Sequence, residues 1–259
     1  MPNKKYFFFD IDGTLAVGTP GNQYVPDSTK LALKQLEEQG HFLAIATGRS
    51  YAMAYQTMQD LGFDNMVSDG GNGITVNNQL IEIKPLDYDK CIALIDECEE
   101  KGVIWAFSPD NEKRRLAPDH RFYDFTHDIY MTTEVVEGLN PRDYDKIYKV
   151  YIACFKGEEE QLETLKELPW VRFHKEYLFV EPADKSKGIK TMVDYFGGEY
   201  KDVVVFGDER NDLSMFRDEW TSIAMGNAID ELKERATYVT SDADKDGIYN
   251  ACKHFGWIE

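Results

Sequence analysis

Long apolar runs are missing from this sequence, which nowhere approaches the roughly 20 consecutive apolar residues that a membrane-spanning helix requires. The first residues also lack the apolar region of a signal peptide. Lys4 and Lys5 precede only the short apolar run 6–9, and the charged Asp10 follows at once. We therefore expect a soluble, cytoplasmic protein.

Cysteine is scarce, and the 259 residues include only Cys91, Cys98, Cys154 and Cys252. None of the four forms a C-x-x-C pair and no histidine cluster accompanies them, so the pattern does not resemble a zinc site or a redox motif. We expect four reduced thiols that are buried or half-buried.

Basic residues are few, with 29 Lys and Arg against 47 Asp and Glu, which gives a net charge of -18. A surface this acidic disfavours binding to nucleic acid and to anionic membranes. It still allows a small anionic substrate where a cation lies at the binding site. The G-x-x-x-x-G-K-[ST] motif is also absent, so nothing indicates a P-loop nucleotide hydrolase.

Strands and helices alternate along the first part of the chain, and the alternation resumes after about residue 186. The apolar patterns predict strands at 6–9 and 41–47 and helices at 27–39 and 49–61. Such alternation predicts a parallel sheet that helices cover on both faces.

The pattern changes in the middle of the chain. A hairpin is expected around Asn77 and Asn78, and a mixed block of helices and strands follows, with a helix after the strand near 149–155. Pro85 and Pro182 lie near the two inner boundaries. We therefore expect a discontinuous core domain, 1–83 and 184–259, interrupted by an inserted α+β domain, 84–183.

Four polar segments fall at one predicted edge of the parallel sheet. Asp10 and Asp12 directly follow the strand YFFF, and the other segments are 47–49, Lys187 at the start of a helix, and 208–212 after the strand VVVF. Ligands of open parallel sheets bind at the carboxyl ends of the strands. The sequence therefore predicts one site at that edge.

The chemistry of that site follows from its carboxylates, which belong to Asp10, Asp12, Asp208 and Asp212. Like charges this close raise one another's pKa and resist ionisation, and a hard divalent cation such as Mg²⁺ removes the conflict. The Thr47 hydroxyl, nearby backbone N–H groups and a lysine would supply donors for phosphate oxygens. This combination indicates phosphoryl transfer.

The segments FFFDIDGTL, ATGR, SKG and FGDERND, in this order, resemble the four signature segments of the haloacid dehalogenase superfamily, in its phosphatase branch. The large insert resembles the superfamily's type-II α/β cap, and GGNGITV, AMGNA and YVTSDADKDGIYNAC resemble the Cof-type sugar-phosphatase-like group. The resemblance covers essentially the whole chain. It implies a Rossmann-like α/β core with an inserted α+β cap, and Mg²⁺-dependent hydrolysis of small phosphorylated metabolites, with sugar phosphates as the expected class.

The resemblance also implies roles for individual residues. Asp10 would be the nucleophile that forms an aspartyl-phosphate, and Asp12 would protonate the leaving oxygen and later activate water. The metal would be held by the Asp10 side chain, the Asp12 backbone carbonyl and Asp208. The phosphate would be bound by Thr47, Gly48, Lys187 and Asn211, with Asp212 supporting the site from behind.

Two lysines compete for one role, because Lys185 and Lys187 both precede the predicted helix in DKSKG. The resemblance favours Lys187, since the family's lysine is usually followed directly by glycine. Lys185 is the alternative.

Charged residues of the insert are the candidates for substrate specificity, because the family's caps close over the active site. We single out Arg114, Arg115 and His120. A solvated charged loop is the competing interpretation, because these positions match no motif.

Two other functions stay open. A phosphomannomutase-like phosphomutase would use the same core but needs a second phosphate site, for which Arg114 and Arg115 are candidates. A non-catalytic phospho-acceptor sensor would also use an acidic pocket, but receiver modules are about half this length, and such a switch would be expected to lack Asp12. In all cases we expect a monomer or weak homodimer.

Overall fold

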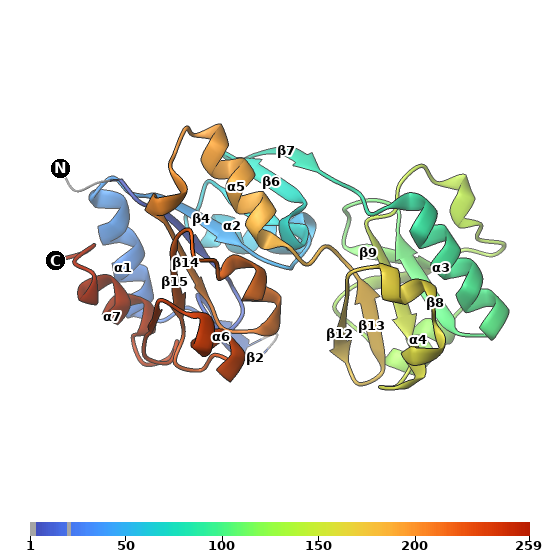
Figure 1. Ribbon diagram of the computed structural model, residues 1–259. Coiled ribbons are helices and arrows are strands. Elements are labelled where there is room, and N and C mark those ends of the chain that lie inside the picture. The colour runs from blue at the N-terminus through green and yellow to red at the C-terminus, as the bar shows by residue number, and fades with distance from the viewer. Residues whose placement is uncertain (1–3, 20–21) are drawn as a thin grey trace. The chain divides into compact units, whose positions relative to one another are not determined.

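The computed structural model describes residues 4–19 and 22–259. The chain divides into two compact units. The first contains Met1–Ser50, Ala54–Ile83 and Asp184–Glu259, and the second contains Lys84–Ala183 together with Tyr51–Met53. The chain thus leaves the first unit after Ile83 and returns to it at Asp184 (Figure 1).

The first unit is built on an eight-stranded sheet. Its six strands from β16 to β5 run parallel, and β6 and β7 add an antiparallel edge. The strands, in their order across the sheet, are β16 (Tyr238–Val239), β15 (Thr221–Ala224), β14 (Val203–Gly207), β1 (Tyr6–Phe9), β4 (Phe42–Ala46), β5 (Met66–Ser68), β6 (Gly73–Val76) and β7 (Gln79–Ile83).

Strand β1 lies at the centre of this sheet, and all four of its residues are buried. Its side chains alternate between the two faces, so that Phe8 belongs to the apolar cluster that includes Ile189 on one face, while Phe7 meets the Trp257 ring at 5.0 Å on the other. A strand covered on both faces consists of a continuous apolar run, which explains the sequence YFFF.

Helices cover the sheet on both sides. Figure 1 shows α1 beside α7, and α5 on the other side of the sheet. The helices of this unit are α1 (Asp27–Glu38), most of α2 (Tyr51–Asp60), α5 (Lys185–Tyr195), α6 (Asp230–Arg235) and α7 (Gly247–His254). This architecture confirms the predicted Rossmann-like α/β core.

The second unit is an α+β domain with a six-stranded sheet, as predicted for the insert. All strand pairs are antiparallel except β9 with β10. The order is β10 (Thr132–Val135), β9 (Arg114–Ala117), β8 (Ile104–Ser108), β11 (Lys149–Ala153), β13 (Tyr177–Val180) and β12 (Trp170–His174). Helix α3 (Tyr88–Lys101) packs on one face of the sheet and α4 (Arg121–Thr126) on the other.

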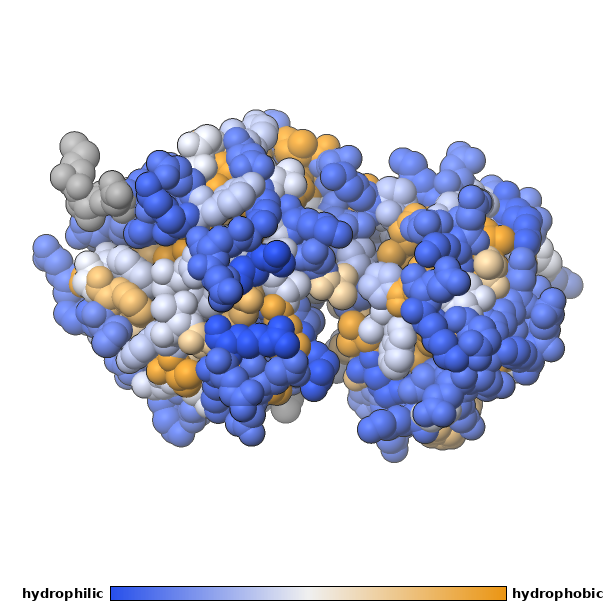
Figure 2. Space-filling model, viewed as in Figure 1, coloured by the Kyte–Doolittle hydropathy of each residue, from blue (hydrophilic) through white to orange (hydrophobic). Residues whose placement is uncertain are grey.

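All four cysteines are buried and free, which confirms the expectation from their spacing. No helix within residues 4–19 and 22–259 is long and apolar enough to cross a membrane. Hydrophilic residues dominate the face of both units that Figure 2 shows.

One predicted hairpin is confirmed. Strands β6 and β7 meet at Asn77 and Asn78, whose φ angles of 49° and 62° fit the tight turn that twisted hairpins prefer. A second hairpin was not predicted, and it joins β2 (Val17–Thr19) to β3 (Asn22–Tyr24).

One predicted helix is wrong in type. The helix expected after β11 is instead two 3-10 turns, η3 (Glu158–Gln161) and η4 (Thr164–Glu167), because the Glu97 carboxylate accepts the backbone N–H groups of Glu163 and Thr164. The polar segment after β14 continues into the 3-10 helix η6 (Arg210–Met215).

Candidate active site

The carboxyl ends of β1 and β14 place two carboxylates side by side. The strands pair with Phe9 opposite Phe206, and the Asp10 N–H donates to the Phe206 carbonyl at 3.0 Å. Asp208 follows β14 directly. Carboxylate oxygens of Asp10, Asp208 and Asp212 all lie within 4.8 Å of one another. The structure thus brings together three of the four predicted carboxylates.

Gly13 leaves room for the Asp208 side chain. A Cβ atom at this position, where φ is +82°, would lie 2.1 Å from Asp208 Oδ2. The neighbouring Thr14 hydroxyl donates to Asp208 Oδ1 at 2.7 Å. The turn after Asp12 therefore holds the Asp208 carboxylate in place.

Asn227 adds a further contact to this turn. Its Nδ2 donates to the Gly13 carbonyl at 2.9 Å and lies 3.4 Å from Asp208 Oδ2. Neither Thr14 nor Asn227 was predicted as a site residue, although both lie in segments that the resemblance singled out, DIDGT and AMGNA.

Lys185 is the lysine of the site. Its Nζ lies 2.7 Å from Asp10 Oδ1 and 2.6 Å from Asp212 Oδ1, and its side chain is 1% exposed. Its backbone N–H, which has no partner within the helix at this position, donates to Ser214 Oγ at 3.0 Å. One cation thus bridges two buried carboxylates.

The prediction of Lys187 is therefore wrong. Its side chain is 79% exposed, and its Nζ lies 3.7 Å from Asp184. The reason is the phase of α5, in which residues four apart share a face. Lys185 precedes the fully buried Ile189 by four residues, whereas Lys187 precedes the exposed Thr191.

Asp212 is fully buried and fixes both Lys185 and the backbone that follows β14. Its Oδ1 accepts from Lys185, and its Oδ2 accepts the backbone N–H groups of Asp208 and Glu209 at 2.9 and 3.1 Å. Both of its oxygens are engaged, so Asp212 supports the site. The adjacent Asn211 has a buried Oδ1 with no hydrogen-bond partner among the described residues.

Thr47 and Gly48 follow β4, the other neighbour of β1. Because Phe9 pairs with Ile45, Thr47 lies just beyond the level of Asp10 at the same edge of the sheet. Thr47 is 1% exposed, and its Oγ1 accepts the Arg49 N–H at 3.1 Å. The predicted phosphate-binding segment therefore lies at the edge that carries the carboxylates.

The Asp12 carboxylate is half exposed and is held by two residues from other segments. Arg49 donates from Nε to Oδ2 at 2.8 Å and from Nη2 to Oδ1 at 2.5 Å, and Gln23 Nε2 donates to Oδ1 at 2.7 Å. Arg49 and Gln23 were not predicted as site residues. Arg49 lies in the ATGR segment, so its position gave a signal, whereas Gln23 gave none.

Burial and mutual repulsion alter the acidities of the cluster. Burial, and then the charge of Asp212, raises the pKa of Asp10 to about 7, although Lys185 opposes the shift. Burial, and then the charges of Asp10 and Asp212, raises the pKa of Asp208 to about 8. Burial of Asp12 would raise its pKa too, but the hydrogen bonds and charge of Arg49 outweigh this effect and lower it.

The oxygen donors of the cluster fit a hard divalent cation. Lys185 engages one Asp10 oxygen and Thr14 engages one Asp208 oxygen. Within the described part of the chain, the second Asp208 oxygen has only the long 3.4 Å contact with Asn227, so each residue can offer a second carboxylate oxygen to a ligand. Burial and mutual repulsion raise the pKa of both residues, so a bound cation would stabilise their charged forms. Carboxylate oxygens without nitrogen or sulfur donors suit divalent cations such as Mg²⁺, Ca²⁺ and Mn²⁺.

The three predicted cap residues lie in the second unit, and the role predicted for one of them, Arg115, is wrong. Arg115 is completely buried, pairs with Asp128, donates to Thr133 at 2.9 Å and stacks its guanidinium 4.4 Å from the Phe122 ring. It is therefore part of the interior of this unit, and we correct its assignment as a specificity residue.

The other two cap residues are accessible. Arg114 forms ion pairs with Asp110, Glu112 and Glu134. His120 lies on the rim of a hollow of about 430 Å³, which is lined by His120, Tyr123, Asp128, Ile129, Met131, Thr132, Thr133 and Val135. Of the three predicted residues, His120 thus lines this hollow.

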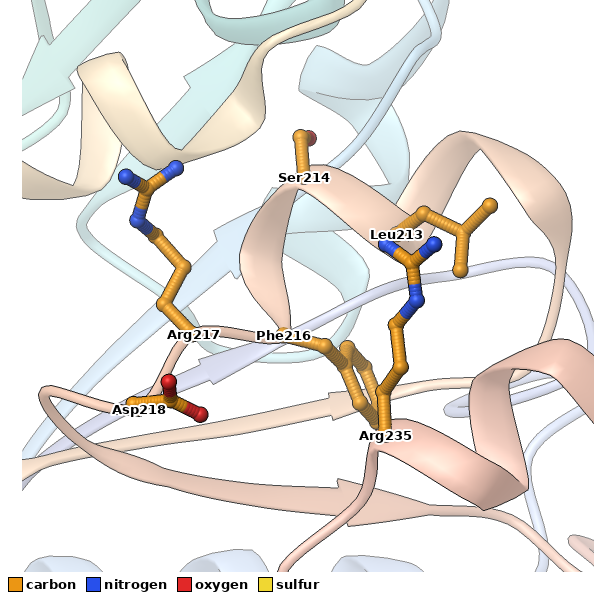
Figure 3. Close-up of a pocket in the computed structure, with 6 residues that line it drawn as sticks. All are labelled: Leu213, Ser214, Phe216, Arg217, Asp218 and Arg235. Atoms are coloured by element: carbon orange, nitrogen blue, oxygen red, sulfur yellow. The ribbon is translucent and has the colours of Figure 1, made fainter.

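A second hollow, of about 420 Å³, lies on the first unit beside η6 (Figure 3). Arg217 and Arg235 rise on either side of Phe216, and Ser214 lies between them. The complete lining is Leu213, Ser214, Phe216, Arg217, Asp218 and Arg235. It includes none of the clustered carboxylates, so this hollow is separate from them.

Comparison with known proteins agrees with this geometry. The chain is 30% identical to the "Putative phosphatase YkrA" of Bacillus subtilis strain 168, over 99% of this chain and 100% of that protein. A solved structure of a hypothetical protein from Geobacillus kaustophilus HTA426 is 33% identical, with a TM-score of 0.83, over 99% of this chain and 100% of that chain.

A second solved structure, the HAD subclass IIB sugar phosphatase BT4131, is 30% identical, with a TM-score of 0.78, over 98% of this chain and 100% of that chain. The family model described as haloacid dehalogenase-like hydrolase matches residues 7–252, which is nearly the whole chain. This protein belongs to the haloacid dehalogenase-like hydrolase family.

Proposed function

We propose that this protein is a Mg²⁺-dependent phosphatase that hydrolyses small phosphorylated metabolites, with sugar phosphates as the substrate class, through an aspartyl-phosphate on Asp10. The observation that carries the proposal is the buried contact of Lys185 with Asp10, next to Asp208. Membership of the family and relatives named as phosphatases support the same reaction.

Asp10 would attack the phosphorus atom with one of its carboxylate oxygens. The bond from phosphorus to the ester oxygen breaks, and that oxygen keeps the electron pair of the broken bond and takes the proton of the protonated Asp12 carboxyl group. A water oxygen then attacks the phosphorus and gives a proton back to Asp12, and the bond to Asp10 breaks. The products are the alcohol and inorganic phosphate, and both aspartates are restored.

The remaining site residues would stabilise the negative charge of the phosphoryl group. Lys185 keeps Asp10 oriented and offsets negative charge near the phosphoryl group, while Thr47, the Gly48 backbone and Asn211 donate to its oxygens. Asp10, Asp208 and the Asp12 backbone carbonyl would hold Mg²⁺, which when bound neutralises charge on the phosphoryl oxygens.

Sugar phosphates are favoured because the relative BT4131, at 30% identity over nearly the whole chain, is described as a sugar phosphatase. We assign the choice of substrate to the inserted unit, where His120 lines a hollow. A cytoplasmic location and a monomer or weak homodimer stay predictions.

The structure weakens the phosphomutase alternative, because that alternative relied on Arg114 and Arg115 as ligands of a second phosphate. A phosphomutase needs a second phosphate site in the inserted unit, but Arg115 is buried and paired, and three carboxylates surround Arg114. The non-catalytic sensor is disfavoured by the presence of Asp12 beside Asp10.

The test is release of inorganic phosphate from sugar, nucleotide and aryl phosphates, with and without Mg²⁺. Wild type is compared with Asp10→Asn and with Asp60→Asn, an aspartate substitution on the exposed end of α2. We expect Mg²⁺-dependent release that Asp10→Asn abolishes and Asp60→Asn retains. Release that persists in Asp10→Asn contradicts the proposal, and isomerisation of hexose phosphates without release would favour the mutase.

A further inference from the structure

Asp12 lies in a closed triangle of hydrogen bonds with Arg49 and Gln23. Arg49 meets both oxygens of the carboxylate through Nε and Nη2, and Gln23 Nε2 donates to Oδ1. The third side is closed because Gln23 Oε1 accepts from Arg49 Nη2 at 3.0 Å. Each of the three side chains is thus fixed by the other two.

The three residues come from separate segments of the first unit. Asp12 follows β1, Arg49 follows β4, and Gln23 lies on β3, so the triangle joins two strand ends of the sheet to the small hairpin. Arg49 is itself anchored through its backbone, since its N–H donates to Thr47 Oγ1 and its carbonyl accepts the Asp69 N–H at 2.9 Å. The guanidinium therefore approaches Asp12 from a fixed base.

The geometry assigns Arg49, with Gln23 as its support, the role of a positioning residue for Asp12, and this inference rests on the proposed function. Nothing in the proposed reaction requires Arg49 to touch the substrate. A carboxyl group that must give a proton to one oxygen and take it from another has to keep one orientation in both steps. A bidentate fork fixes that orientation, because two parallel N–H groups define the carboxylate plane.

The nitrogen atoms of Arg49 are already committed. Nε and Nη2 contact Asp12, and Nη1 lies 3.4 Å from Thr57 Oγ1. The side chain is also only 22% exposed. A direct contact with a substrate would break one of these bonds, so action through Asp12 is the more economical role.

A positioning role has a kinetic signature that depends on the leaving group. A sugar alkoxide needs a proton as it departs, whereas a nitrophenolate is a stable anion and departs without one. Loss of Arg49 should therefore lower kcat/KM for sugar phosphates much more than for p-nitrophenyl phosphate.

The experiment measures kcat/KM for glucose 6-phosphate and p-nitrophenyl phosphate in wild type, Arg49→Met, Arg49→Lys, Asp12→Asn and the double variant Asp12→Asn/Arg49→Met. We expect Arg49→Met to lower kcat/KM for the sugar phosphate by about 10- to 100-fold, which is less than the roughly 10²- to 10⁴-fold that complete loss of general acid–base catalysis costs. The loss of kcat/KM for the aryl phosphate should be about tenfold smaller. Arg49→Lys should restore little, because an ammonium group cannot form the fork.

The double variant decides whether Arg49 acts through Asp12. Residues that act as a unit are not additive, so Arg49→Met should cost nothing further once Asp12 is Asn. Additive losses, or equal losses for both substrates, would overturn the inference and indicate a substrate-binding or purely structural role. Arg235→Met, which removes an arginine with an exposed ion pair to Glu231, is the matched control.

Failure of this inference is distinguishable from failure of the proposed function. If Asp10→Asn retains phosphate release, the proposed function fails whatever Arg49 does. If Asp10→Asn is inactive but Arg49→Met behaves like wild type on both substrates, the function stands and the positioning role is wrong.

Discussion

The Lys185 ammonium group lies 2.7 Å from Asp10 Oδ1, and both side chains are almost completely buried, at 1% and 4% exposure. A second contact at 2.6 Å ties the same nitrogen to Asp212, whose other oxygen holds the backbone after β14. Burial lowers the tendency of a lysine to carry charge, but the two carboxylates outweigh it and raise the pKa of Lys185. The proposed nucleophile is therefore always next to a cation.

Removal of this cation should abolish turnover and destabilise the protein. Lys185→Met leaves two buried carboxylates without their partner, which costs about 3–5 kcal/mol of unfolding free energy where a buried pair is broken. Lys187→Met, two residues along the same helix and exposed, should change stability by less than about 0.5 kcal/mol and leave phosphate release intact.

Urea unfolding and phosphate release on both variants check this prediction. A silent Lys185→Met with an inactive Lys187→Met would reverse the assignment of the two lysines.

Metal binding should become tighter as the pH rises. The pKa values of Asp10 and Asp208, about 7 and 8, lie above their ordinary value of 3.8, so the metal-free fold binds protons that the unfolded chain has lost. The resulting stability is fully present below about pH 4 and is lost as the pH rises through 7 and 8. Mg²⁺ replaces those protons, so its stabilising effect should grow over the same range.

The measurement is the Tm with EDTA and with Mg²⁺ between pH 6 and 9. We expect the Tm of the metal-free protein to fall with pH, and the increase on adding Mg²⁺ to be larger at pH 8.5 than at pH 6. Asp208→Asn should remove the increase. A Mg²⁺ effect that shrinks as the pH rises would show that these two carboxylates do not hold the metal.

Gly13 offers a test of the space around Asp208. Gly13→Ala would place a methyl group 2.1 Å from Asp208 Oδ2 at a φ of +82°. Gly40→Ala is the matched control, because Gly40 has a φ of +81° but no atom within 4 Å of the added Cβ. Both changes should cost roughly 1–2 kcal/mol of backbone strain, so the difference between them isolates the clash.

Calorimetric titration with Mg²⁺ checks this comparison. We expect Gly13→Ala to lose Mg²⁺ affinity at least about tenfold and Gly40→Ala to retain it, since metal sites depend on groups that orient their ligands. Equal affinities in the two variants would mean that the turn at Gly13 does not set the position of Asp208.

The sheet and its carboxylate edge could be predicted from the sequence because their signals are local. YFFF and VVVF are continuous apolar runs that end in aspartates, and a parallel sheet necessarily gathers such ends at one edge. The same local patterns predicted the hairpin at Asn77 and the inserted α+β unit.

The sequence also contains a signal for Lys185 as the lysine of the site. The apolar periodicity of the helix favours Lys185, whereas the dipeptide Lys-Gly favours Lys187. Ile189, Met192 and Val193 define the buried face of α5, and Lys185 shares that face, four residues before Ile189. Two residues along a helix lie on different faces, so the Lys-Gly motif alone led to the wrong prediction of Lys187.

Other features depend on contacts between distant segments and left no local signal. The burial of Arg115 is set by Asp128 and the Phe122 ring, which no spacing pairs with it. Gln23 reaches Asp12 only because an unpredicted hairpin folds beside the end of β1. The 3-10 turns after β11 arise where Glu97 captures two backbone N–H groups.

The most direct test of the central claim is to find the phosphoryl group on Asp10. Asp12→Asn should slow hydrolysis of the aspartyl-phosphate by about 10²- to 10⁴-fold, so that it accumulates from p-nitrophenyl phosphate, and borohydride reduces an acyl phosphate of aspartate to homoserine. Mass spectrometry of the quenched protein should then find homoserine at position 10, and none in the variant that also carries Asp10→Asn. Turnover without homoserine at position 10, or with the label at another aspartate, would contradict the account.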